Sequence, residues 1–246
     1  MDSPHFGVGS GAQGSAADHL AYITRQARHS DRGDLGEVGY GNMPPWAQAD
    51  PSLLWKASDR YERKNGSRFR SFTVGLPNCL TNEQLVALAW EQARQLAGSK
   101  PFQFALHLSH SSLSGEFNPH VHVMVCDRTP DEHDRPPELM FKRYNAAHPE
   151  RGGCKKDSGG MSPQRLKEKL LEQRARAVAT SNEALALHGH DVRFDHRSLL
   201  ARGINRKPER YLGPARVAAL SEDERNTFAK RRQEQRETPQ PGHQNQ

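Results

Sequence analysis

Two stretches of alternating residues constrain the fold more than any other feature of this chain. In "PFQFALHLSH" (101–110), every second residue from Phe102 to Leu108 is apolar. Residues two apart on a strand share a face, so this period of two predicts a β-strand with His107 on the opposite face. A loop, "SSLSGEFNP", separates this stretch from a second predicted strand, "HVHVMVCD" (120–127). We treat the two as candidate neighbours in one sheet.

The rest of the chain mixes strands and helices without strict alternation. Ser15 with Asp18, and Thr81 with Gln84, have the spacing of capping boxes that open helices. Residues 30–51 are rich in Gly, Asp and Pro, which predicts a long loop. The expected strands are 5–9 and 69–77, and the expected helices are 16–29, 51–66, 81–97 and 163–187. This mixture indicates an α+β fold, with a central antiparallel sheet covered by helices.

Composition indicates one domain of ordinary size followed by a tail. The chain has 246 residues, of which 34% are hydrophobic, and its mean hydropathy of -0.89 predicts a modest core. We expect one domain over residues 1–215 and a charged, disordered tail over 216–246. The net charge of +6 and the pI of about 9.4 favour a polyanionic partner such as DNA or RNA.

The cysteines and the hydropathy pattern exclude several classes of protein. The 3 cysteines form no CxxC pair, so neither a disulfide framework nor a four-cysteine zinc site is expected. The first residues lack the pattern of a signal peptide, and no apolar stretch approaches the roughly 18 residues of a membrane span. We therefore expect a cytoplasmic protein with no membrane insertion.

Histidines gather on the polar face of the two alternating strands. His120 and His122 lie two apart and project together, and His107 joins them if its strand pairs alongside. Three neutral imidazoles would form an open metal site with positions left for water or substrate. The alternative for each is an ordinary, hydrogen-bonded core histidine. Histidine-triad nucleotide hydrolases are disfavoured, because the position where they need a further histidine holds Met124.

Several motifs, in order, resemble one known family. They are a tyrosine in "AYITRQ", a histidine in "ALHLSH", then "NPHVHVMV", "FKRYN" and "DHRSLLARGI". Together they resemble the MobA/MobL family of plasmid-mobilisation relaxases, from about residue 5 to about residue 213. The resemblance implies a site-specific, single-strand DNA nicking enzyme of the HUH class, built on a palm-like antiparallel sheet.

The resemblance also implies roles for individual residues. Tyr22 would be the nucleophile, and His107, His120 and His122 would hold a divalent metal ion, Mg²⁺ or Mn²⁺. A tyrosine hydroxyl has an ordinary pKa of about 10 and is a weak nucleophile at neutral pH. Arg25 lies one helical turn from Tyr22 and could help the phenolate form. The alternative for Tyr22 is a ring that packs in the core.

One departure from the family pattern affects the predicted chemistry. Some relatives carry carboxylates on the strand that runs up to an "LP" turn beside the metal. Here that strand is "FRSFTVGLP", with Ser71 and Thr73 where an acid is expected, so the general base is left open. Two other functions therefore remain: an inactive or weak relaxase-like module that binds DNA, and a rolling-circle replication initiator with the same chemistry.

A basic stretch after the second strand is a candidate DNA interface. Cations neutralise phosphates, and an aromatic ring can stack on an unpaired base. The residues concerned are Lys142, Arg143, Tyr144, Arg151, Lys155 and Lys156. A solvated basic loop is the alternative. The expected partners are single-stranded DNA at a transfer origin, with a hairpin as a candidate element, and accessory mobilisation proteins.

Overall fold

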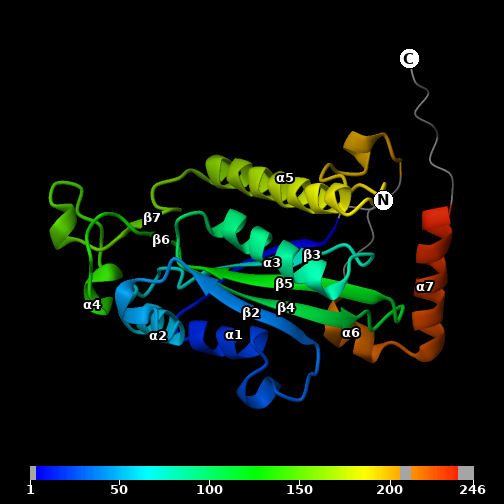
Figure 1. The fold of residues 1–246 in the computed structure, drawn as a ribbon, viewed down its shortest axis with the longest axis horizontal. Coiled ribbons are helices and arrows are strands. Elements are labelled where there is room, and N and C mark those ends of the chain that lie inside the picture. Colours follow the sequence, from blue (N-terminus) through cyan, green and yellow to red (C-terminus); the bar gives the residue numbers. More distant parts are fainter. Residues whose placement is uncertain (1–3, 206–211, 238–246) are drawn as a thin grey trace.

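A five-stranded antiparallel sheet forms the centre of the protein (Figure 1). The structure is a computed structural model that describes residues 4–205 and 212–237. The strands are β1 (Phe6–Ser10), β2 (Leu35–Gly41), β3 (Arg70–Gly75), β4 (Phe102–His110) and β5 (Phe117–Val125), in the order β1-β3-β5-β4-β2. The α+β fold predicted from the sequence is confirmed.

The two alternating stretches form the central pair, β4 and β5, as predicted. Their register pairs Phe102 with Val125 and His107 with His120. The second strand begins at Phe117, three residues before the expected start, because the residues that precede His120 also pair with the end of β4. Both strands are flanked on each side, so they are buried along most of their length.

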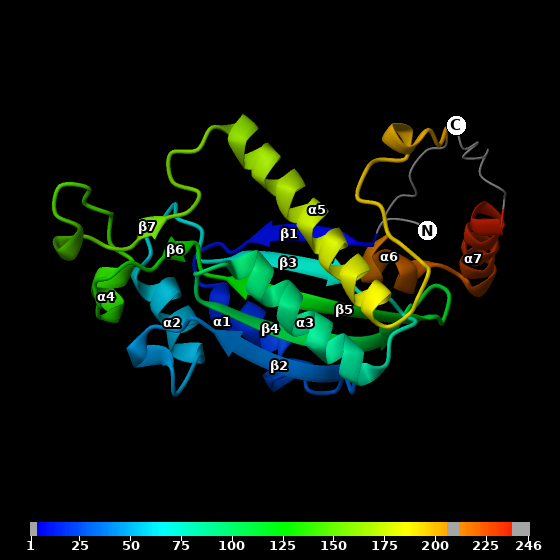
Figure 2. The same cartoon turned by 45° about the horizontal axis from the view of Figure 1, so that its top comes forward.

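Helices α3 (Asn82–Ala97) and α5 (Pro163–Leu187) cover one face of the sheet (Figures 1 and 2). The predicted capping box opens α3, since the Thr81 side chain accepts from the Gln84 backbone and the Gln84 side chain accepts in return. The apolar side chains of β4 and β5, among them Phe104 and Val123, pack beneath α3 in the larger core cluster. This face is therefore filled by side chains.

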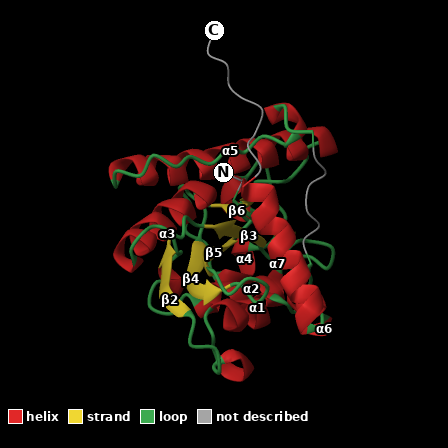
Figure 3. Cartoon of the chain, turned by 90° about the vertical axis from the view of Figure 1, so that its right-hand side faces the viewer, coloured by secondary structure: helices red, strands yellow, loops and turns green. Residues whose placement is uncertain are grey.

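Helices α1 (Ala16–Ile23) and α2 (Ser52–Tyr61) lie on the opposite face (Figure 3). Their apolar side chains, including Ile23 and Trp55, pack against Ala105 and Met124 of the central strands. The Trp55 indole N–H donates to Gln103 Oε1 at 2.9 Å, so this buried polar pair is satisfied. A short α1 covers only part of this face, which is the face that carries the histidines.

The predicted helix 16–29 is shorter than expected, and the capping box at Ser15 is wrong. Helix α1 ends at Ile23, and residues Ala27–His29 form a separate 3₁₀ turn, η1. Ser15 makes no side-chain cap; the carboxylate of Asp59, from α2, accepts from the Ala16 N–H at 3.0 Å. Packing between α1 and α2 supplied the cap that local sequence was expected to provide.

The prediction of a loop over 30–51 is wrong for residues 35–41, which form the edge strand β2. The glycines that suggested a loop allow close approach of neighbouring rings. A Cβ at Gly39 would lie 2.4 Å from Phe104 Cε1 and 2.5 Å from Trp90 Cζ2, so a side chain there would expel both rings. The short turn η2 (Pro45–Ala47) follows before α2.

The C-terminal segment contains helices. After the turn η4 (Leu200–Arg202) come α6 (Gly213–Ala219) and α7 (Glu222–Glu237), and in Figure 1 they lie at the opposite end of the molecule from α4. The domain boundary at residue 215 stays a prediction, and residues 238–246 of the predicted tail lie outside the described part. No helix in the described ranges combines the length and apolarity that a membrane span requires.

A lobe of irregular structure, residues 128–156, follows β5. It contains β6 (Arg128–Thr129), α4 (Pro137–Met140), η3 (Pro149–Arg151) and β7 (Lys155–Lys156). Buried Arg128 ties this lobe to α2: its Nε and Nη2 each donate at 2.9 Å to a carboxylate oxygen of buried Glu62. The same guanidinium donates to the carbonyls of Phe141, Lys142 and Cys154, so one side chain organises the lobe.

Replacing Arg128 with methionine is expected to destabilise the protein by about 3–5 kcal/mol, because the buried Glu62 carboxylate loses the guanidinium that binds both of its oxygens and Lys156, at 3.4 Å, compensates only in part. Urea unfolding of the variant and the wild type measures the difference. Arg165→Met is the control, since that side chain is 53% exposed and pairs only at the surface. An equal, small effect of the two substitutions would contradict this role for Arg128.

Candidate metal and tyrosine site

Three imidazoles converge on the face of the sheet that α1 covers. Because β4 and β5 pair His107 with His120, and His122 follows two residues later, all three side chains point to the same side. One ring nitrogen from each lies within 4.8 Å of the others, and the ring centroids are 4.7 to 5.2 Å apart. The sequence prediction that these histidines come together is confirmed geometrically.

Burial holds the three rings in the neutral form that a metal ligand needs. Desolvation lowers the pKa of His107 to about 4 and that of His122 to about 2. The pKa of His120 is also lowered, chiefly by burial. At neutral pH the cluster therefore presents uncharged nitrogen donors rather than mutually repelling imidazolium ions.

Hydrogen bonds from within the sheet orient the rings of His120 and His122. His120 Nδ1 lies 3.0 Å from the Asn118 carbonyl oxygen, which can only accept, so Nδ1 carries the proton and Nε2 keeps its lone pair. His122 Nδ1 lies 3.1 Å from Thr73 Oγ1, on the neighbouring strand β3. Bonds of this kind fix the tautomer of metal-binding histidines and are part of the site.

Tyr22 lies beside this cluster. It occupies the last turn of α1, half-buried, with its ring centroid 6.2 Å from that of His122 and 5.2 Å from that of His29. The Arg25 guanidinium carbon lies 5.3 Å from the centre of the same ring. The structure thus brings the predicted tyrosine, the predicted arginine and the histidines into one place.

Arg25 is buried between the tyrosine and the histidines. Its backbone has a φ of 54°, a left-handed conformation that turns the chain back at the end of α1. Its side chain is 5% exposed and donates through Nη1 to the Tyr22 carbonyl oxygen at 3.1 Å and approaches His107 Nδ1 with Nη2 at 3.0 Å. The early end of α1 therefore decides where this guanidinium lies.

Asp34 joins the site without having been predicted from the sequence. Its two carboxylate oxygens accept from Arg25 Nε at 2.7 Å and Nη2 at 2.9 Å, and these bonds hold the pKa of Asp34 below its ordinary value. Asp34 immediately precedes β2, whose first residue, Leu35, pairs with His107. Recognising 35–41 as a strand would have brought this acid to the site.

Thr73 occupies the position on β3 where a carboxylate was expected from the family pattern, and it contacts His122 there. Its register partner on β5 is His122, and its hydroxyl makes the 3.1 Å contact with the Nδ1 of that ring. Ser71 pairs with Met124 instead, one step further from the histidines. The neutral hydroxyl orients His122 without adding negative charge to the site. The carboxylate that does take part in the site is that of Asp34, which binds Arg25.

The predicted DNA contacts lie in the lobe 128–156, beyond the C-terminal end of β5, whereas His120 and His122 lie near the middle of that strand. Tyr144 is half-buried, and four of the basic residues are exposed: Lys142, Arg143, Arg151 and Lys155. Lys156 differs, since its side chain is 10% exposed and its Nζ donates to the Ser67 carbonyl oxygen at 2.9 Å and pairs with Glu62 at 3.4 Å. Lys156 therefore joins the lobe to Glu62 and Ser67 outside it, and we leave it out of the proposed interface.

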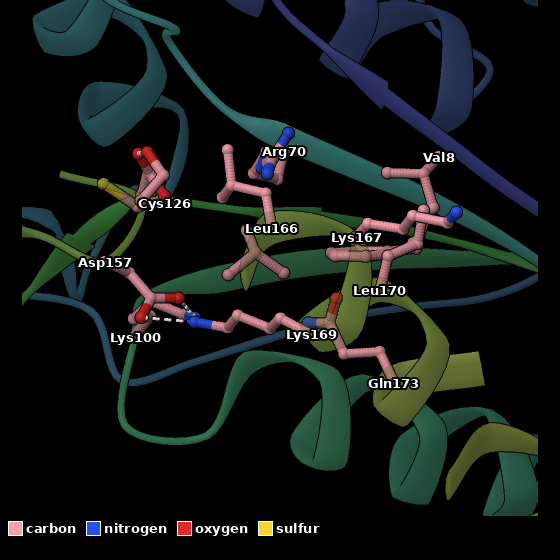
Figure 4. Close-up of a pocket in the computed structure, with 14 residues that line it drawn as sticks. Val8, Arg70, Lys100, Cys126, Asp157, Leu166, Lys167, Lys169, Leu170 and Gln173 are labelled. Atoms are coloured by element: carbon pink, nitrogen blue, oxygen red, sulfur yellow. Dashed lines mark hydrogen bonds and ion pairs between the residues drawn. The ribbon is translucent and has the colours of Figure 1, made fainter. Parts of the chain in front are cut away.

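A cavity of about 280 Å³ lies on the other face of the sheet, between β1, β3 and the first half of α5 (Figure 4). Its wall includes Phe72 and Val125, whose side chains point away from the histidine face. Lys100 and Lys169 both pair with Asp157 at 2.6 Å at its edge. The sheet separates this cavity from the tyrosine and the histidines.

Comparison with known proteins adds a family match. The MobA/MobL family model matches residues 35–221. A 43 kDa relaxation protein of Salmonella typhimurium is 36% identical over 210 residues, which is 84% of this chain and 57% of that protein. Mobilization protein A of Escherichia coli is 40% identical over 213 residues, which is 85% of this chain and 28% of that protein. The chain thus spans little more than half of the first relative and under a third of the second.

Among solved structures, one determined for work on vancomycin resistance transfer in Staphylococcus aureus has a TM-score of 0.57 and 21% identity. The match covers 80% of this chain and 99% of the other. At that identity the likeness concerns the fold, and it agrees with the sheet and helices described above.

Thr73→Val is expected to weaken Mn²⁺ binding by about 10- to 100-fold, because the bond that orients His122 is removed while the side chain keeps its shape. Isothermal titration calorimetry of the full chain measures the dissociation constant. Thr73→Ser, which keeps the hydroxyl, is the matched control and should bind nearly as the wild type does. Equal affinities for the valine and serine variants would show that this hydroxyl does not orient a ligand.

Proposed function

The chain belongs to the MobA/MobL family, and from that premise we propose that it is a metal-dependent relaxase that nicks one DNA strand at a plasmid transfer origin. The observation that carries the proposal is the position of Tyr22, with its ring centroid 6.2 Å from His122 in a cluster of three neutral imidazoles. We place this activity in the cytoplasm, together with accessory mobilisation proteins.

The reaction is a transesterification. The Tyr22 oxygen attacks the scissile phosphorus, loses its proton, and forms an Oη–P bond while the P–O3′ bond breaks. The products are a 5′-phosphotyrosine and a DNA strand that ends in a 3′-hydroxyl, so the phosphodiester energy is retained for rejoining. The ordinary pKa of tyrosine, about 10, makes the hydroxyl a weak nucleophile at neutral pH. The Arg25 guanidinium carbon lies 5.3 Å from the ring centre, so its positive charge is close to the negative charge that develops during the attack.

His107, His120 and His122 would hold the metal ion, which when bound acts as a Lewis acid on the phosphate oxygens. The donors fit such an ion: all three are neutral nitrogens held at mutual distances within 4.8 Å. A set of imidazoles without a carboxylate suits a transition metal better than Mg²⁺, which prefers oxygen ligands. We therefore propose Mn²⁺ in preference to Mg²⁺.

Single-stranded DNA is the proposed substrate, and the exposed cations of the lobe 128–156 are its proposed contacts away from the tyrosine. The residues are Lys142, Arg143, Arg151 and Lys155, with Tyr144 as a stacking surface. They lie beyond the end of β5, so they would bind DNA several nucleotides from the scissile phosphate. Their role is affinity rather than chemistry.

A DNA-binding module that does not cut is the second candidate function. The observation that favours it is Thr73, which occupies the β3 position next to His122 without supplying a carboxylate. Such a module would bind the same DNA and form no covalent product. A rolling-circle initiator would share the covalent product, and membership of the MobA/MobL family favours mobilisation over replication.

Tyr22→Phe is expected to abolish covalent adduct formation with single-stranded origin DNA in the presence of Mn²⁺, because the attacking oxygen is removed and the ring is kept. A denaturing gel with 5′- and 3′-labelled oligonucleotides measures the adduct and shows which end is attached. Tyr40→Phe, an exposed tyrosine on β2, is the control and should react like the wild type. Tight binding by the wild type without any adduct would support the module and reject the relaxase.

The double variant Lys142→Ala/Arg143→Ala is expected to bind single-stranded DNA with a shallower salt dependence. The slope of log K against log salt should fall by about 1.4, because each phosphate that a cation no longer neutralises reduces the slope by about 0.7. Fluorescence anisotropy over a series of salt concentrations measures it. Lys230→Ala, an exposed lysine on α7, is the control, and an unchanged slope in the double variant would remove the lobe from the interface.

A further inference from the structure

His107 differs from the other two histidines, because both of its ring nitrogens are engaged. Nδ1 lies 3.0 Å from Arg25 Nη2, and Nε2 lies 2.7 Å from the Ile23 carbonyl oxygen. A guanidinium can only donate and a carbonyl can only accept. The tautomer follows from these two partners: Nδ1 has the lone pair and accepts from Arg25, and Nε2 has the proton and donates to Ile23.

The lone pair of His107 Nδ1 can serve one partner at a time. A metal ligand must offer a lone pair, and the Nε2–H bond to a backbone carbonyl is the arrangement that usually supports a ligand from behind. Nδ1 is therefore the nitrogen that would bind a metal, and Arg25 Nη2 lies directly on it. Metal binding to His107 and the hydrogen bond from Arg25 exclude each other.

The positive charge of buried Arg25 lies beside a site proposed to bind a metal cation, an arrangement that is electrostatically unfavourable and therefore suggests a functional role for Arg25. Arg25 is 8% exposed, it repels a divalent ion, and its left-handed backbone is unfavourable for a residue with a Cβ. The carboxylate of Asp34 compensates by holding Nε and Nη2 through a bidentate pair. Asp34 keeps the guanidinium at the site whether or not Nη2 also reaches His107.

We propose that Arg25 occludes His107 Nδ1 until a metal ion displaces it, and that Asp34 is the positioning residue that keeps the released guanidinium beside Tyr22. Displacement frees one N–H of Nη2 at a point where the ring of Tyr22 is already adjacent. That N–H then becomes available to the phenolate oxygen or to a phosphate oxygen. This inference rests on the proposed function and adds that Arg25 opposes metal binding while it favours cleavage.

The first experiment separates occlusion from simple charge repulsion. Mn²⁺ binding to the full chain without DNA is measured by calorimetry for the wild type, Arg25→Gln, and the double variant Arg25→Gln/Asp34→Asn. The double variant removes one positive and one negative charge, so the net charge of the site matches the wild type. We expect both variants to bind Mn²⁺ roughly tenfold more tightly, as loss of a charge-assisted hydrogen bond predicts.

Cleavage is expected to change in the opposite direction. At saturating Mn²⁺, adduct formation by both variants should fall by about 100-fold, since the donor near the reacting oxygen is gone. Tighter metal binding with slower cleavage supports the proposal. Unchanged or weaker Mn²⁺ binding by the charge-matched double variant overturns it, whatever happens to cleavage.

A second measurement uses the wild type alone and stays informative if a variant fails to fold. Ring ¹⁵N signals of His107 should show a protonated Nε2 and an unprotonated Nδ1, and titration with diamagnetic Zn²⁺ should shift the Nδ1 signal. A Zn²⁺ shift at Nε2 instead would overturn the proposal. These readouts need no DNA, so they hold even if Tyr22 forms no adduct, in which case only the proposed function fails.

Discussion

The register between β4 and β5 is the constraint on which the rest of the site depends. It sets His107 opposite His120 and leaves His122 one step along on the same face. A slip of one residue would turn His107 towards α3 and bring Leu106 or Leu108 to the histidine face. Such a slip would bury a polar ring in the larger core and expose apolar side chains, so the hydrophobic pattern that folds the sheet also assembles the histidine cluster.

The end of α1 decides which groups meet that cluster. The helix stops at Ile23, whose carbonyl accepts from His107, and the left-handed Arg25 turns the chain back over the sheet. Had the helix continued to residue 29, Arg25 would have followed the helical path away from Asp34. One local break therefore supplies both the acceptor that fixes a tautomer and the cation beside Tyr22.

Two buried arginines, Arg25 and Arg128, each donate two hydrogen bonds to one carboxylate, but the two pairs have different roles. Arg128 is enclosed by Glu62 and three backbone carbonyls, so all its donors serve the architecture of the lobe 128–156. Arg25 also has a bidentate carboxylate, but one further donor is directed at a histidine nitrogen that has chemistry of its own. The position of a buried arginine can change on metal binding when its hydrogen-bond acceptor is itself a candidate metal ligand. The arginine N–H and the metal ion then compete for the same nitrogen lone pair.

The sequence alone determined the central strand pair, the face shared by His107, His120 and His122, the capped helix α3 and the long helix α5, because these follow from periodicity and local capping. Tertiary structure decided the rest. Strand β2 packs closely against the rings of Phe104 and Trp90 because Gly39 has no Cβ, and α1 is capped by Asp59 from another helix. The roles of Asp34, Thr73 and the inward-turned Lys156 were invisible in sequence for the same physical reason. Each acts through a partner on a different element, which only the folded chain brings within hydrogen-bonding distance.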